Sequence, residues 1–290
     1  MNIWDLIVAL ILGIVEGLTE FAPVSSTGHM IIVDDMLLKS AELLGSPEVA
    51  NTFKVVIQLG SIMAVVIVFW SRLWSLVGIN IGGSEKIVPV TKSKSRLKLT
   101  HVIIGLLPAV VFGFTFESFI DKYLFRVETV LIGLIAGALL MILADWKTKQ
   151  AKKQNKHFEA ASIDEVTYKQ ALLIGLFQCI ALWPGFSRSG ATISGGVLMG
   201  LKYRAAADFT FIMAVPIMFG ASAVSLLKKM DMLTTDVIPF FAVGFISAFF
   251  FAWLSIRFFL ALISRIKLLP FAIYRIVLAV VLGIVYINMM

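Results

Sequence analysis

The sequence predicts an all-α integral membrane protein, an inverted-topology repeat with about six transmembrane helices and two re-entrant helical hairpins. Its composition is 59% hydrophobic and 15% charged, with a mean hydropathy of +0.95, far from the usage of soluble proteins. The apolar runs do not alternate with polar residues, as membrane β-strands do. No long polar block separates these runs, so we expect a single membrane domain over residues 1–290.

The formal charge of +7 does not indicate nucleic-acid binding. Lys and Arg lie in the loops between apolar runs, where orientation in the membrane explains them, and no stacking or groove-reading motif accompanies them. Cys179 is the only cysteine, which excludes an internal disulfide and a thiolate metal cluster.

The first element is expected to be a hairpin that does not cross the membrane. Residues 1–38 contain no Lys or Arg, so a cleavable signal peptide is not expected. Apolar residues run from Ile3 to Val15, Glu16 and Glu20 interrupt them, Pro23 breaks the helix, and Met30 to Leu38 resume it. Each half is shorter than the about 20 residues that a crossing needs. Two short helices around a polar break predict a re-entrant hairpin, which needs surrounding protein or a water-filled cavity.

Six later runs are long enough to cross with their flanks: Val55–Trp70, His101–Phe116, Val130–Ala144, Ala205–Leu227, Ile238–Phe259 and Pro270–Ile287. The loops 71–100 and 146–170 are rich in Lys and Arg, which places them in the cytoplasm by the positive-inside rule. Segments 34–54 and 117–128 then lie outside, and both termini are expected to be external.

The region after Tyr168 repeats the opening stretch at an offset of 162 residues. Identical pairs at this offset are Ala9 and Ala171, Leu10 and Leu172, Gly13 and Gly175, Ser25 and Ser187, Gly28 and Gly190, and Ile31 and Ile193. Glu16 aligns with Gln178, and Ser26 with Arg188. Three crossings separate the copies, so the second hairpin must enter from the opposite face, as in inverted repeats. Repeat one covers about residues 1–145 and repeat two about 165–290.

Two carboxylates precede the first break. Glu16 and Glu20 are four residues apart, so on a helix they share a face. Carboxylates this close repel unless they share a proton or take up a cation, and Mg²⁺ or Ca²⁺ suits them, particularly with phosphate ligands. The alternative is a structural pair facing polar neighbours.

Hydroxyl groups and an imidazole follow at the start of the returning helix. Ser25, Ser26 and Thr27 precede Gly28, and a helix start with free amides binds anions. Ordinary N-capping is the alternative. His29 lies three residues after Ser26, near enough on a helix to act as a general base or acid, although a structural hydrogen-bonded histidine fits the same position.

The second break carries a guanidinium among hydroxyls. Arg188 lies between Ser187 and Ser189, and Thr192 follows one turn later. Arg binds two phosphate oxygens at once and keeps its charge; the alternative is that Arg188 extends to the cytoplasmic surface. Together the breaks offer metal-binding carboxylates, a nucleophile, a base and an anion clamp, which suits phosphoryl transfer.

These motifs, Glu16-x-x-x-Glu20 with Pro-Val-Ser-Ser-Thr-Gly-His and Pro-Gly-Phe-Ser-Arg-Ser-Gly-Ala-Thr192, resemble the undecaprenyl pyrophosphate phosphatases of the bacitracin-resistance type. The similarity runs the whole length and includes 51–61 and 271–276. It implies a multi-pass hydrolase of the bacterial cytoplasmic membrane that converts C55 polyprenyl diphosphate to the monophosphate, recycling the carrier for peptidoglycan. It also implies a divalent cation and a site open to the outer face.

The family's functional residues carry over to Glu16, Glu20, Ser26, His29, Ser187, Arg188 and Thr192. Our hypothesis is that both carboxylates hold the cation, Arg188 neutralises phosphate, Ser26 attacks and His29 handles its proton. Ser25, Thr27 and Ser189 are expected to join Ser187, Arg188 and Thr192 around the diphosphate. Attack by His29 or by water fits the same residues.

A second class of function fits the predicted architecture. Inverted repeats with broken helices are typical of transporters, so a transporter or flippase for a polyprenyl phosphate lipid is the alternative. The pairing of Ser26 with His29 argues against it, because transport needs no nucleophile and base. The sequence leaves open whether the protein also moves lipid, and whether it forms a homo-oligomer.

Overall fold

The computed structural model describes residues 1–79, 96–154, 162–229 and 234–289, and its regular elements there are all helical, as expected. The helices, in chain order, are α1 (Ile3–Thr19), α2 (Ser26–Met30), the π-helix η1 (Ile31–Leu38), α3 (Ser40–Leu43), α4 (Pro47–Val68), α5 (Trp70–Leu76), α6 (Leu99–Tyr123), α7 (Val127–Lys153), the 3₁₀ turn η2 (Ile163–Glu165), α8 (Tyr168–Ile180), α9 (Arg188–Leu198), α10 (Tyr203–Lys228), α11 (Ile238–Ile266) and α12 (Leu269–Met289).

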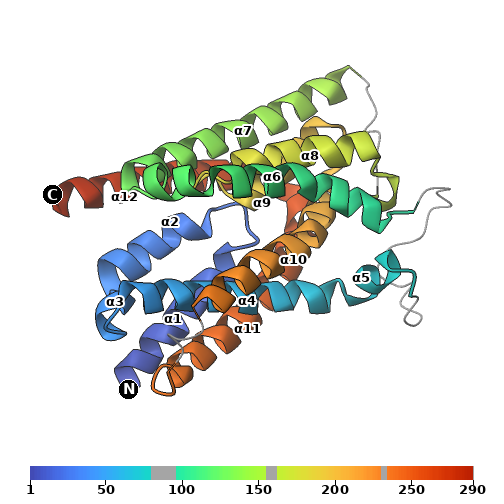
Figure 1. Ribbon diagram of the computed structural model, residues 1–290. Coiled ribbons are helices and arrows are strands. Elements are labelled where there is room, and N and C mark those ends of the chain that lie inside the picture. The colour runs from blue at the N-terminus through green and yellow to red at the C-terminus, as the bar shows by residue number, and fades with distance from the viewer. Residues whose placement is uncertain (80–95, 155–161, 230–233, 290) are drawn as a thin grey trace.

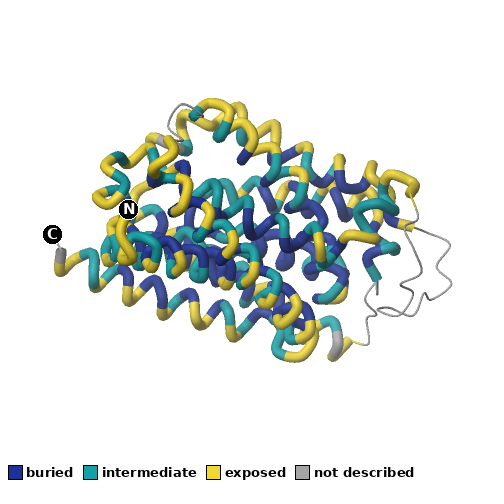
Figure 2. Tube along the Cα trace, turned by 90° about the horizontal axis from the view of Figure 1, so that it is seen from below, coloured by how far each residue is buried: buried dark blue, intermediate teal, exposed yellow. Residues whose placement is uncertain are grey.

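Six described helices, α4, α6, α7, α10, α11 and α12, are long and apolar enough to cross a membrane, which confirms the predicted crossings. They lie roughly along one direction of the molecule (Figure 1). Large apolar side chains such as Phe114, Ile246 and Phe258 are exposed on their outer surfaces, while buried residues fill the middle of the bundle (Figure 2). An apolar exterior around a packed interior is the arrangement expected where lipid is the solvent.

The remaining long elements form the two hairpins. α1 runs from the amino end into the bundle, and α2 with η1 returns to the same end; α8 and α9 enter from the opposite end (Figure 1). Both termini lie at the end where α1 begins. The described parts of the Lys- and Arg-rich loops, 71–79, 96–100, 146–154 and 162–170, lie toward the other end (Figure 1); residues 80–95 and 155–161 fall outside the described residues. Lys228, in contrast, ends α10 at the terminal side.

The turn of each hairpin has the same backbone geometry. Ser25 and Ser187 have φ of 72° and 71°, in a region that residues with a side chain rarely adopt. Each hydroxyl caps the following helix by accepting a hydrogen bond from a backbone amide, Gly28 at 3.3 Å and Gly190 at 3.2 Å. These residues are two of the pairs related by the 162-residue offset, so the repeat extends to backbone conformation.

Each hairpin packs against a helix of the other half, α1 on α11 and α8 on α6. The matched glycines Gly13 and Gly175 make this approach close, because a Cβ at Gly13 would overlap the Gly244 carbonyl oxygen, and one at Gly175 the Gly105 carbonyl oxygen. Ser247 of α11 also donates to the Leu10 carbonyl of α1 at 2.9 Å. The halves therefore interlock, and the two breaks come together in the centre.

Gly175→Ala is expected to lower the melting temperature of the protein in detergent by several degrees. The added methyl group must push α8 away from α6, and overpacking of this kind costs about 1–3 kcal/mol, more than the helix propensity gained from Ala. Gly220→Ala is the control, because a Cβ there meets nothing within 4 Å; equal melting temperatures for the two variants would contradict the close packing.

Ser187→Ala is expected to destabilise the protein more than Ser187→Gly. Both variants lose the cap on α9, which is worth about 1 kcal/mol, but glycine adopts a φ of 71° without strain whereas alanine does not. Thermal melting of both variants measures the difference. An alanine variant at least as stable as the glycine variant would show that the turn is not strained.

Candidate active site

The side chains of Glu20 and Arg188 join the two breaks. The Arg188 Nη2 donates to Glu20 Oε1 at 3.3 Å, and the Ser26 hydroxyl donates to Glu20 Oε2 at 2.6 Å. The exposed fractions of the Arg188 and Glu20 side chains are 15% and 7%, so Arg188 does not extend to the cytoplasmic surface. One carboxylate thus contacts the predicted nucleophile on one side and the predicted anion clamp on the other.

The Arg188 guanidinium has an N–H donor that no described residue accepts. The guanidinium lies 5.7 Å from the centre of the Phe21 ring, a contact that favours a cation. Its Nη1 is buried and has no hydrogen-bond partner among the described residues. A buried, unpartnered N–H of a permanent cation is costly unless a ligand supplies an acceptor, so this atom points to an anion site.

Glu16 lies one turn before Glu20 and is 5% exposed; its carboxyl group interacts with that of Glu20. Within the described ranges, no group of three or more His, Cys, Asp and Glu side chains could hold a metal ion. Two carboxylates still fit Mg²⁺, which is often bound by one or two carboxylates together with substrate phosphate oxygens and water.

His29 faces away from Ser26. Its Nδ1 lies 2.8 Å from the Ser25 carbonyl oxygen and its Nε2 lies 2.6 Å from the Tyr274 hydroxyl of α12. The expected pair of Ser26 with His29 is therefore not formed in this structure, where Ser26 pairs with Glu20 instead. Tyr274 had no assigned role in the sequence, since a tyrosine in an apolar segment looks the same as one at a membrane interface.

Most of the other predicted hydroxyl groups make hydrogen bonds to the backbone. Ser25 and Ser187 cap their helices, as described above, and Thr27 is half-buried beside Ser26. Ser189 donates to the Ala22 carbonyl at 3.1 Å, which connects the second break to the first. Thr192 is fully buried; it donates to the Arg188 carbonyl at 2.8 Å and accepts from Thr210 at 3.0 Å. Ser189 and Thr192 hold Arg188 in place.

Arg275 is a second residue that the sequence did not single out. Its side chain is fully buried, and its Nη2 donates to the carbonyls of Gly133 at 3.2 Å and Gly185 at 2.9 Å. Gly137 leaves room for it, because a Cβ there would overlap the guanidinium. Arg275 therefore ties α12 to α7 and to the turn that precedes Arg188.

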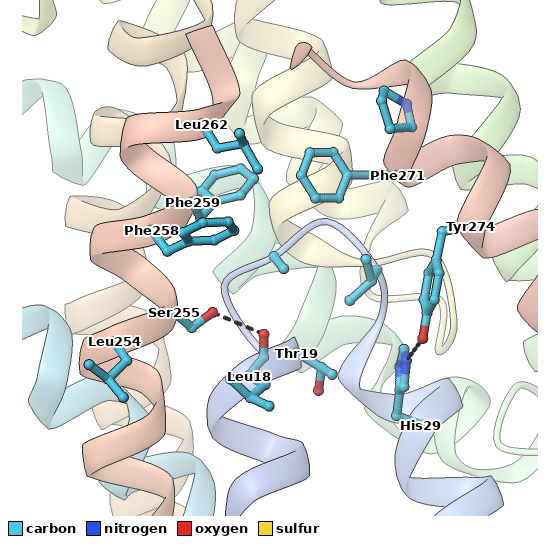
Figure 3. A pocket seen from close by; sticks show the side chains of 13 residues that line it. Leu18, Thr19, His29, Leu254, Ser255, Phe258, Phe259, Leu262, Phe271 and Tyr274 are labelled. Atoms are coloured by element: carbon cyan, nitrogen blue, oxygen red, sulfur yellow. Dashed lines mark hydrogen bonds between the residues drawn. The ribbon is translucent and has the colours of Figure 1, made fainter. Parts of the chain in front are cut away.

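An apolar cavity of about 590 Å³ lies beside His29. The end of α1, the first break, α11 and α12 form its walls, with Phe258, Phe259, Leu262 and Phe271 on one side (Figure 3). His29 and Tyr274 lie at the opposite edge and are joined by their hydrogen bond (Figure 3). Phe258 and Leu254 are also exposed on the outside of the bundle, so the cavity opens sideways toward the lipid-facing surface.

Comparison with known proteins gives one consistent family. Residues 9–281 match the family model described as Bacitracin resistance protein BacA. The chain is 63% identical over 286 residues to an undecaprenyl-diphosphatase of Geobacillus sp. (strain WCH70), covering 99% of this chain and 100% of that protein. It is 59% identical over 282 residues to an undecaprenyl-diphosphatase of Bacillus subtilis (strain 168), covering 97% and 98%. The chain therefore belongs to the bacitracin resistance protein BacA family.

Proposed function

We propose that this protein hydrolyses undecaprenyl diphosphate to undecaprenyl phosphate and inorganic phosphate, recycling the lipid carrier and giving resistance to bacitracin. The observation that carries this proposal is the contact of Arg188 with Glu20 beside Ser26, with one guanidinium nitrogen left for a phosphate oxygen. The names of the relatives support the same substrate and reaction. The sideways-open apolar cavity suits a prenyl chain, which keeps its distal part in the bilayer.

In our proposal the diphosphate lies with its terminal phosphate between Arg188 and Ser26. Arg188 and the free amides at the start of α9 neutralise the phosphate oxygens. Ser26 Oγ attacks the terminal phosphorus while its proton passes to Glu20 Oε2, the acceptor 2.6 Å away. The bond to the bridging oxygen breaks, and undecaprenyl phosphate leaves. Water then attacks the phosphorus of phosphorylated Ser26 while His29, the remaining base of the site, takes a proton from that water. Inorganic phosphate leaves, and Glu20 returns the proton to Ser26 Oγ.

Glu16 and Glu20 are the residues that would hold a divalent cation, Mg²⁺ or Ca²⁺. When bound, such an ion supplies positive charge next to the phosphate oxygens. Without it, the two neighbouring carboxyl groups share a proton, and the negative charge that remains between them opposes the approach of a diphosphate. We propose the cation because its positive charge would offset the negative charge of the carboxyl groups and the diphosphate.

We also propose that the termini and the site opening face the outside of the cell. The Lys and Arg content of the loops 71–100 and 146–170 supports this orientation. A cysteine introduced at Asn2 is expected to react with a membrane-impermeant thiol reagent added to intact protoplasts. Reaction only after lysis would reverse the assignment.

The test of function is direct. Purified protein in detergent, given undecaprenyl diphosphate and Mg²⁺ or Ca²⁺, is expected to release inorganic phosphate, and chelation is expected to stop the release until either cation is restored. No phosphate release under any of these conditions would contradict hydrolysis and would favour transport of the lipid. Release that is insensitive to chelation would contradict the cation site alone.

Arg188→Lys is expected to lose most of the phosphatase activity, about a hundredfold or more in kcat/KM, as for loss of one transition-state donor. Lysine keeps the charge but cannot reach Glu20 and a phosphate oxygen with one planar fork. Arg257→Lys is the matched control, because Arg257 is exposed and stacks on Trp253 away from the site. Near-full turnover by Arg188→Lys would remove Arg188 from the clamp.

Radiolabelled substrate is expected to leave labelled phosphate on Ser26 when the reaction is quenched rapidly. Serine phosphate esters survive acid, whereas phosphohistidine does not, so acid and alkaline quenches followed by peptide mapping separate Ser26 from His29. Label on His29 would reject Ser26 as the nucleophile. Turnover with no covalent adduct under either quench would favour direct attack by water.

A further inference from the structure

The contact between His29 and Tyr274 joins two parts of the chain 245 residues apart, the first break and α12. The two rings are nearly parallel, at 7°, with their centres 5.6 Å apart. Both residues line the apolar cavity, where water is a poor alternative partner. An imidazole nitrogen facing such a wall costs free energy unless a donor or acceptor meets it.

The partners of His29 define its protonation pattern. The Ser25 carbonyl oxygen can only accept, so Nδ1 carries the hydrogen. In the neutral imidazole, Nε2 is then the unprotonated, basic nitrogen, and the Tyr274 hydroxyl donates to it at 2.6 Å. The two hydrogen bonds together fix one tautomer and one ring orientation, with the basic nitrogen directed toward the cavity edge.

Building on the proposed function, we propose that Tyr274 is a positioning residue for the phosphatase reaction, which acts by holding the His29 imidazole with Nε2 as its basic nitrogen. Without the phenol hydroxyl, Nε2 faces apolar side chains such as Phe271 and the ring gains orientations that satisfy it elsewhere. The carboxylate that orients the catalytic histidine of serine proteases has this effect, because its replacement by an amide leaves the geometry intact but lowers kcat.

Tyr274→Phe tests the assignment, because it removes one oxygen and keeps the ring against the cavity. We expect kcat to fall about tenfold, as for the loss of one hydrogen bond, with KM for undecaprenyl diphosphate changed less than twofold. Tyr286→Phe is the control: Tyr286 lies on the same helix and loses a similar bond, to Glu128 at 2.6 Å, away from the cavity. Its kcat is expected to match that of the unmodified protein.

A second measurement does not depend on activity. Diethyl pyrocarbonate modifies unprotonated imidazole nitrogens, and peptide mapping separates His29 from the other histidines. We expect His29 to react several times faster in Tyr274→Phe than in the unmodified protein or in Tyr286→Phe, because Nε2 is no longer occupied.

Each outcome decides something. Equal modification rates would show that Tyr274 does not occupy Nε2, and an unchanged kcat would show that the contact does not position His29 for catalysis; either result overturns the proposal. A rise in KM with unchanged kcat would assign Tyr274 to lipid binding instead. If the unmodified protein releases no phosphate, the proposed function fails. The modification rates still decide whether the Tyr274 hydroxyl is hydrogen-bonded to His29 Nε2.

Discussion

The ion pair between Glu20 and Arg188 is the interaction on which the site depends. Both side chains are largely buried, and removing one partner of a buried pair costs about 3–5 kcal/mol because the other charge is left uncompensated. The two residues come from hairpins that enter the bundle from opposite ends. The pair therefore depends on how the two halves pack, and the chemistry of the central site depends on the same packing.

The backbone at the breaks makes this meeting possible. The positive φ of Ser25 and Ser187 turns each chain sharply. The first residue of each following helix then contacts Glu20, Ser26 from the same hairpin and Arg188 from the opposite one. The caps to Gly28 and Gly190 offset part of the strain. Strain of this kind is common at functional sites, where the surrounding packing over-determines the conformation.

Much of the fold was predictable because its signals are local. Apolar run length identifies a crossing, a proline beside hydroxyls identifies a break, and an odd number of crossings sets the second hairpin opposite the first. The identity of Ser25 with Ser187 and Gly13 with Gly175 indicated the repeat, and the same residues carry its geometry in the structure. The π-helical form of η1 had no signal in the sequence, because 31–38, apolar apart from Asp34 and Asp35, reads as an ordinary helical segment.

Sequence reasoning grouped Glu20, Ser26 and Arg188, which the structure also places in contact, but it did not give their pairings. Helical spacing placed Ser26 next to His29, yet the imidazole bonds back to the Ser25 carbonyl and Ser26 turns toward Glu20. Side-chain directions at a helix start depend on the strained residue before it, which periodicity does not describe. Tyr274 and Arg275 were missed because their roles depend on contacts with residues more than 80 positions away in the chain.

The direct interaction of Glu20 with Arg188 joins the two hairpins. A double-mutant cycle on thermal unfolding in detergent tests it, with Glu20→Gln, Arg188→Gln and the double variant. Residues in direct contact show coupling of about 0.5–3 kcal/mol. We predict that the double variant loses less stability than the sum of the two single losses, because neither charge is then left alone. Additive losses would contradict the pairing and the composite site built on it.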